Sequence, residues 1–92
     1  MTIIKDMKEK QVVKFAKHTG CPKCRFLDMS INSSEHKEDI KTIYLEDYTP
    51  DDFLELGISG TPVMAVVENG EIIKRDATVI TSEQLEEFMG AV

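Results

Sequence analysis

The order of strand and helix patterns along the chain restricts its fold more than any other feature of the sequence. Four short segments have the apolar, β-branched and aromatic content of strands, and helical or tight-turn segments separate them. The predicted strands are residues 12–16, 40–45, 63–67 and 71–74. The predicted helices begin at residue 22 or 23, at residue 50 and at residue 82, and end near residues 32, 56 and 89. This alternation predicts an α/β protein.

The connections between the predicted strands indicate how they pair. A helix joins the first two strands, so we expect them to be parallel with a right-handed crossover. Asn69-Gly70 is the strongest short hairpin signal in the chain, and it makes the last two strands antiparallel. Residues 63–67 are almost continuously apolar, which places them near the centre of the sheet. The prediction is a three-layer α/β sandwich, with a mixed four-stranded sheet flanked by three or more helices.

Local signals mark the ends of the helices. Thr49 precedes Pro50 as the cap of the second helix, and Gly57 suits its left-handed stop. Thr81 and Gln84 form a capping box at the start of the last helix. The residues predicted to face the core from these two helices are Phe53, Leu54, Leu56, Leu85, Phe88 and Met89. Residues 2–10 are compatible with a short helix or an extra strand, and the sequence does not choose between them.

Size and charge exclude several classes of function. With 92 residues the chain is expected to form a single domain over residues 1–92, and a monomer is the simplest expectation. The net charge of −6 argues against nucleic acid or an anionic membrane as the main partner. No apolar run is long enough to cross a bilayer, and the first ten residues lack an apolar secretory core. We therefore expect a cytoplasmic protein.

The only two cysteines, Cys21 and Cys24, stand between the first predicted strand and the first predicted helix. A cysteine at a helix N-terminus is favoured as the thiolate by free backbone N–H groups and the helix dipole, and Lys23 adds a positive charge beside it. Cys24 follows one turn later, where it can resolve a mixed disulfide formed at Cys21. Pro22 suits the first turn of the helix. The pattern predicts a dithiol that exchanges disulfides, a chemistry that requires no metal or other cofactor.

Two other classes of function compete with this reading. Cys21 and Cys24 could join His18 and His36 in a zinc-binding module, because the ligand types and spacing are those of zinc sites. The second half of the chain predicts a sheet and helices that a zinc finger does not need. A redox-inactive adaptor is the third class, and the intact cysteine pair argues against it.

The chain resembles the thioredoxin superfamily over nearly all residues after Lys10. Residues 12–25, with Cys-Pro-Lys-Cys, look like glutaredoxins, whereas residues 56–72 and 84–88 look more like thioredoxins. The resemblance implies a thioredoxin-like fold and a protein-disulfide oxidoreductase. It also implies a cis bond between Thr61 and Pro62 that shapes a substrate groove opposite the cysteines, with Gly60 beside it. Lys17 resembles a glutaredoxin lysine that contacts glutathione, although a solvated lysine at a strand end is an equal alternative.

The chain also departs from both families. Thioredoxins carry a buried acid on the first strand beneath the cysteines, and here the stretch reads Lys14-Phe15-Ala16. Glutaredoxins carry a Gly-Gly and acidic pair that helps to hold glutathione, and here residues 74–77 read Lys-Arg-Asp-Ala. The expected recycling partner is therefore a thioredoxin-reductase-like flavoprotein, with a glutathione-dependent glutaredoxin as the alternative. The expected substrates are protein disulfides.

Three residues near the predicted site have weaker assignments. Lys14 is expected to extend its amine to the surface, and the alternative is a position near the cysteines in place of the missing acid. His18 is expected to be an exposed loop residue, and the alternative is proton exchange with the thiols. Nothing in the sequence marks Tyr44 as functional.

Overall fold

The computed structural model describes residues 4–92, which form a four-stranded sheet and three α-helices. The strands are β1 (Gln11–Ala16), β2 (Ile40–Tyr44), β3 (Val63–Glu68) and β4 (Glu71–Asp76). The helices are α1 (Pro22–Asn32), α2 (Pro50–Glu55) and α3 (Ser82–Gly90). Two single 3-10 turns, η1 (Lys37–Asp39) and η2 (Leu45–Asp47), flank β2. No helix among the described residues has the length and apolar content needed to cross a membrane.

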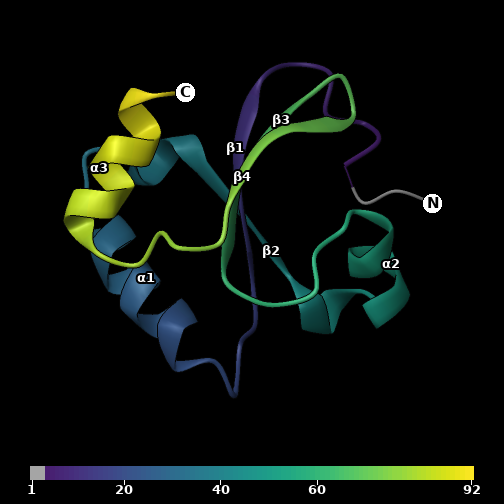
Figure 1. Ribbon diagram of the computed structural model, residues 1–92, viewed down its shortest axis with the longest axis horizontal. Helices are drawn as coiled ribbons and strands as arrows, with labels where there is room; N and C mark the ends of the chain where they lie inside the picture. The colour runs from purple at the N-terminus through teal and green to yellow at the C-terminus, as the bar shows by residue number, and fades with distance from the viewer. Residues whose placement is uncertain (1–3) are drawn as a thin grey trace.

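The strands are arranged in the order β2-β1-β3-β4, so β1 and β3 are central (Figure 1). β1 pairs with β2 in parallel and with β3 antiparallel, and the hairpin β3–β4 is antiparallel. The mixed sheet predicted from the connections is therefore confirmed. The parallel register places Ala16 directly beside Tyr44, so the carboxyl ends of β1 and β2 meet at one edge of the sheet.

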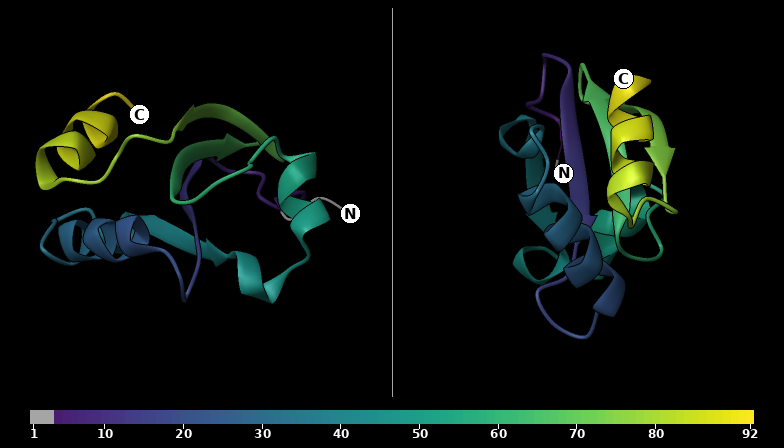
Figure 2. Two further views of the ribbon diagram at one scale, coloured as in Figure 1. Left: turned by 60° about the horizontal axis from the view of Figure 1, so that its bottom comes forward. Right: turned by 90° about the vertical axis from the view of Figure 1, so that its left-hand side faces the viewer.

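Helices cover both faces of the sheet. Helices α1 and α3 lie together on one face, and α2 lies on the other (Figures 1 and 2). The buried core on the side of α1 and α3 contains Val12, Leu27, Ile31, Met64, Val66, Val79, Leu85 and Phe88. The buried core on the other side contains Ile4, Val13, Phe15, Ile43, Phe53, Ile58, Val63, Ala65 and Val67. Alternate residues of β1 and β3 thus face opposite layers.

The predicted turn and helix caps form as the local sequence indicates. Asn69 and Gly70 have φ values of 54° and 74°, which is the pair of left-handed residues that a two-residue type I′ hairpin requires. The hydroxyls of Thr49 and Thr81 accept hydrogen bonds from backbone N–H groups in the first turns of α2 and α3, and both capping boxes are complete. Gly57 ends α2 with a φ of 75°.

The part of the N-terminal segment that the structure describes differs from both sequence expectations, and residues 2 and 3 of that prediction lie outside the described residues. Residues 4–10 form neither a helix nor a strand. Instead, Ile4 is 1% exposed within the core beside α2. The backbone N–H groups of Asn69 and Gly70 donate to the carbonyls of Lys8 (3.2 Å) and Met7 (2.9 Å), so the segment is attached to the β3–β4 turn. These contacts join residues more than sixty positions apart, and local sequence carries no signal for them.

The prediction that Leu54 faces the core is wrong, because its side chain is 60% exposed. Helix α2 has only six residues, and Phe53, which precedes Leu54, occupies the face of the helix that packs on the sheet. Adjacent helical positions point about 100° apart, so a single short helix buries one of them and exposes the other. Strand β2 also ends at Tyr44 rather than residue 45, and β4 continues two residues beyond residue 74.

Candidate active site

Cys21 and Cys24 are joined by a disulfide at the N-terminus of α1. Cys21 is the cap residue of the helix, Pro22 is its first residue, and the Cα atoms of the two cysteines are 5.3 Å apart. The backbone N–H of Cys24 donates to Sγ of Cys21 at 3.3 Å. A sulfur that accepts a hydrogen bond at a helix N-terminus is stabilised as a thiolate when the disulfide opens.

The two sulfurs differ in their access to solvent. Both cysteines are largely buried, but Cys21 is 9% exposed and Cys24 only 1%. Cys24 is enclosed by Ala16 of β1 and by the ring of Tyr44 at the end of β2, which form a small cluster with the two cysteines. A substrate can therefore approach Cys21 more easily than Cys24, as an attacking sulfur and a resolving sulfur require.

Thr61 lies directly against Cys21, and the bond between Thr61 and Pro62 is cis, as the family resemblance implied. Sγ of Cys21 is 3.4 Å from the hydroxyl oxygen of Thr61 and 3.7 Å from its carbonyl oxygen. The hydroxyl can donate a hydrogen bond to a thiolate at Cys21. The segment that precedes β3 thus forms one wall of the space above the leading sulfur.

The expectation that Lys14 reaches solvent is wrong. Lys14 points from β1 toward α1, and its side chain is only 4% exposed. Its ammonium group forms an ion pair with the carboxylate of Asp28, one helical turn after Cys24. Lys14 also lies 5.8 Å from the ring centre of Tyr44, which packs on the cysteines. A buried cation therefore lies near Tyr44 on β1, the strand on which the resembling thioredoxins carry a buried acid.

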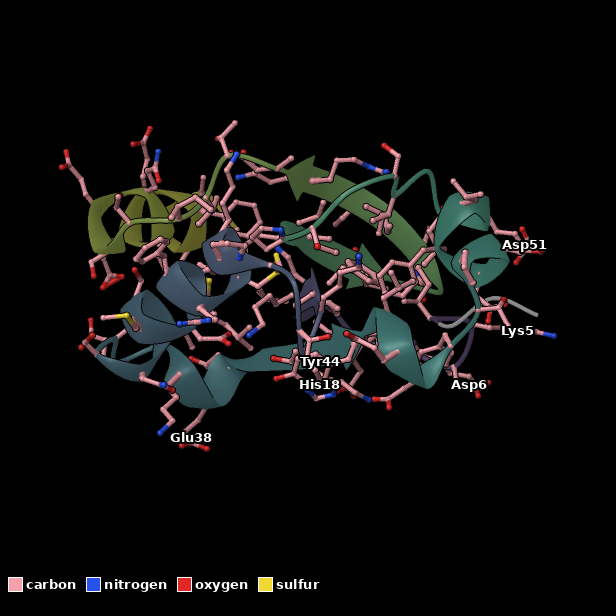
Figure 3. All side chains as sticks on the ribbon, turned by 90° about the horizontal axis from the view of Figure 1, so that it is seen from below. Lys5, Asp6, His18, Glu38, Tyr44 and Asp51 are labelled. Carbon is pink, nitrogen blue, oxygen red and sulfur yellow. A yellow bond between two sulfur atoms is a disulfide. The ribbon has the colours of Figure 1, made fainter. Side chains whose placement is uncertain are left out.

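The loop between β1 and α1 is held by Tyr44 and Glu46. The ring of His18, which is exposed as predicted, stacks on the ring of Tyr44 with centres 3.6 Å apart (Figure 3). Both carboxylate oxygens of Glu46 accept a hydrogen bond from the backbone N–H of His18 at 3.0 Å, and one also accepts from Thr19. The bond from His18 is the main cause that lowers the pKa of Glu46, because it stabilises the carboxylate.

Burial raises the pKa of Tyr44, and the nearby carboxylates of Asp28, Asp47 and Glu46 raise it further by repelling the phenolate. Tyr44 therefore stays a neutral phenol through the neutral pH range. Sequence analysis missed this residue. The position of Tyr44 near the cysteines could have been inferred from the predicted parallel pairing of residues 12–16 with residues 40–45. The carboxyl ends of parallel strands lie at the same edge of a sheet.

Two hollows flank residues 58–61, beside Cys21. The first has a volume of about 210 Å³, and it is lined by Lys17 and Gly60, the two residues that the sequence analysis proposed for substrate binding. The second has a volume of about 320 Å³, and Lys23 and Arg75 are its charged residues. Arg75, on β4, was not singled out from the sequence. Its guanidinium donates to the carbonyls of Leu56 (2.7 Å) and Gly57 (3.0 Å) across the chain.

The structure does not gather the four ligands of the zinc alternative. The two cysteines are bonded to each other, and His36 lies beyond the far end of α1, where its Nε2 is 3.2 Å from the carboxylate of Glu86. Within residues 4–92, the cluster of potential metal ligands is Glu35, His36 and Glu86, which lies apart from the cysteines. The arrangement of Cys21 and Cys24 therefore serves disulfide chemistry better than metal binding.

Solved thioredoxins share this fold over most of their length. The thioredoxin of Fasciola hepatica superposes with a TM-score of 0.69 at 16% identity, covering 92% of this chain and 82% of that one. For the oxidised form of mitochondrial thioredoxin 3 of Saccharomyces cerevisiae, the TM-score is 0.67 at 18% identity, with 97% and 83% covered. For Malassezia sympodialis thioredoxin it is 0.70 at 15% identity, with 96% and 78% covered.

No protein-family model and no curated protein matches the chain in sequence. The structural likeness at 15–18% identity shows that the chain has the thioredoxin fold. The fold predicted from the order of strands and helices is thereby confirmed. Function has to be argued from the residues of the site.

Proposed function

We propose that this chain is a thiol–disulfide oxidoreductase that reduces protein disulfides through a reversible disulfide between Cys21 and Cys24. One observation carries the proposal: two bonded sulfurs at the start of α1, the leading one more exposed and in contact with Thr61. The thioredoxin fold supports this proposal. The fold places the Cys21–Cys24 pair between β1 and α1, where the sulfurs can exchange disulfides.

The reaction begins at Cys21 of the reduced protein. Its thiolate, stabilised by the N–H of Cys24 and by the helix N-terminus, attacks one sulfur of a substrate disulfide. A bond forms between Cys21 and that sulfur, and the substrate's own sulfur–sulfur bond breaks. The second substrate sulfur leaves as a thiolate and takes a proton from water.

Cys24 completes the reaction. Its thiol loses a proton and attacks Sγ of Cys21, which forms the Cys21–Cys24 disulfide and breaks the mixed disulfide. The remaining substrate sulfur leaves as a thiolate. The substrate has then gained two electrons, and the protein has lost them. The folded chain accommodates the product disulfide, because the two Cα atoms lie 5.3 Å apart, within the range for a disulfide.

The recycling partner we propose is a thioredoxin-reductase-like flavoprotein that returns two electrons to the disulfide. Lys17, which lines the hollow beside Thr61, is the observation that favours the alternative, glutathione. Against that alternative, Asp76 stands in the region that holds glutathione in glutaredoxins, and its Oδ1 accepts hydrogen bonds from the hydroxyl and the backbone N–H of Thr78. One carboxylate oxygen of Asp76 is therefore already engaged within the chain.

Insulin reduction with two recycling systems tests the proposal. Catalytic amounts of the chain are supplied with either NADPH and thioredoxin reductase or glutathione and glutathione reductase. We expect turnover with thioredoxin reductase, and Cys21→Ser is expected to lower it to the rate of buffer alone. Turnover with the glutathione system but not with thioredoxin reductase would show that glutathione, rather than a flavoprotein, recycles the disulfide. Absence of turnover with both systems, or full activity of Cys21→Ser, would contradict the proposed function.

A further inference from the structure

The charged groups around the two hollows have one sign. Lys17 is the charged residue of the first hollow, and Lys23 and Arg75 are those of the second. No acidic side chain among the described residues lines either hollow. The chain as a whole has 17 acidic and 11 basic residues, so an all-cationic lining runs against its composition.

Two acidic residues close in sequence to residues that line the first hollow accept hydrogen bonds from the backbone. Glu46 accepts hydrogen bonds from the N–H groups of His18 and Thr19. The carboxylate of Asp52 accepts from the N–H of Thr49 in the cap of α2. The cations of the hollows, in contrast, form no ion pair among residues 4–92. Arg75 is fixed at the wall of its hollow by two N–H bonds to carbonyls and keeps its other N–H groups for a ligand.

The two hollows share one wall. Residues 58–61 line both of them, and Thr61 touches Sγ of Cys21. A polypeptide that passes over Thr61 and Cys21 and enters both hollows would meet Lys17 in one and Lys23 with Arg75 in the other. A compact ligand on one side of Cys21 would meet only one of these groups.

We propose that the two hollows bind a protein substrate whose disulfide lies in an extended acidic segment, with carboxylate side chains on both sides of the attacked sulfur. The inference rests on the proposed function, since it assumes that Cys21 attacks. Complementary charge would speed association and orient the segment. It would also offset the repulsion that a chain of net charge −6 exerts on other acidic proteins.

Three matched peptides test this inference. Each contains one disulfide at its centre and has Glu, Gln or Lys at the flanking positions. The rate constant for reaction with the reduced protein is measured at low and high ionic strength. We expect the Glu peptide to react about tenfold or more faster than the Lys peptide at low salt, with the Gln peptide between them and the difference shrinking as salt rises.

Variants identify the cations. Lys17→Gln and Lys23→Gln are each expected to reduce the ratio of the Glu rate to the Lys rate severalfold. Lys41→Gln is the matched control, because Lys41 is exposed on β2, lines neither hollow and carries the same charge. The ratio is the readout, since it cancels any change in the reactivity of Cys21 itself.

The outcomes separate the inference from the function on which it rests. Failure of the Gln peptide to react would contradict the proposed function. Equal rates for all three peptides would leave the function standing and overturn the inference. A Lys41→Gln effect as large as those of Lys17→Gln and Lys23→Gln would overturn it too, since the selectivity would then follow net charge. Oxidised glutathione reacting as fast as the Glu peptide would also overturn it, in favour of a small carboxylate ligand.

Discussion

Lys14 and Asp28 form an ion pair in which the two partners have very different access to water. The side chain of Lys14 is 4% exposed, whereas that of Asp28 is 39% exposed. A carboxylate at this position can be solvated without its partner, but the ammonium group cannot. The stabilising role of the pair is therefore to neutralise the buried ammonium group of Lys14.

This asymmetry predicts unequal effects of removing the two charges. Asp28→Asn is expected to lower the free energy of unfolding by about 1–3 kcal/mol, because it leaves a buried charge without a counter-charge. Lys14→Met is expected to change it by about 1 kcal/mol or less, because methionine fills a similar volume and Asp28 turns to water. Urea unfolding of the oxidised proteins measures both. A larger loss for Lys14→Met than for Asp28→Asn would contradict this account.

The grouping of Cys21, Cys24, Thr61 and Pro62 could be predicted because each belongs to a local pattern or to a motif of the resembling families. Sequence analysis misplaced Lys14 because alternation along a strand says which face a side chain takes, not what it meets there. Asp28 supplies the missing partner from α1, and only the packing of that helix on β1 brings the two together.

At the scale of elements, the loop between β1 and α1 depends on the turn that follows β2. Glu46 in η2 accepts hydrogen bonds from the backbone of His18 and Thr19, which position the chain just before Cys21. The lowered pKa of Glu46 means that these bonds stabilise the fold above the usual carboxyl pKa of 4.5. The contribution is lost as the pH falls through the lower value in the folded protein.

The amide protons of His18 and Thr19 should report this titration directly. Their chemical shifts are expected to change with a midpoint below 4.5, followed by NMR in an acid titration. Glu46→Gln is expected to abolish the change, and Asp47→Asn is the matched control that should leave it in place. A midpoint at or above 4.5 would show that Glu46 does not hold the loop. The same conclusion would follow if the chemical-shift change persisted in Glu46→Gln.

The elements themselves could be predicted where their signals are local. The capping boxes at Thr49 and Thr81 and the Asn69-Gly70 turn each rest on a few neighbouring residues, and the structure confirms them. Leu54 was wrongly predicted to be buried because only one face of a short helix contacts the sheet. In α2 that face carries Phe53, whose ring packs edge-on against Phe15 of β1.

At the scale of the whole molecule, the unpredicted features all join distant parts of the chain. The N-terminal segment attaches to the β3–β4 turn, Tyr44 meets the cysteine cluster, and Arg75 meets the carbonyls after α2. Each depends on strand register and layer packing, which no local pattern encodes. The fold as a whole could be predicted because its connections permit few topologies.

If Cys21 attacks and Cys24 resolves, removal of Cys24 should trap the mixed disulfide on Cys21. Reduced Cys24→Ser is mixed with oxidised insulin, and Cys21→Ser serves as the matched control with the other cysteine intact. Intact-mass spectrometry is expected to show a one-to-one adduct through Cys21 that dithiothreitol releases, and none with Cys21→Ser. An adduct that forms through Cys24 in the control, or no adduct in either variant, would contradict the account.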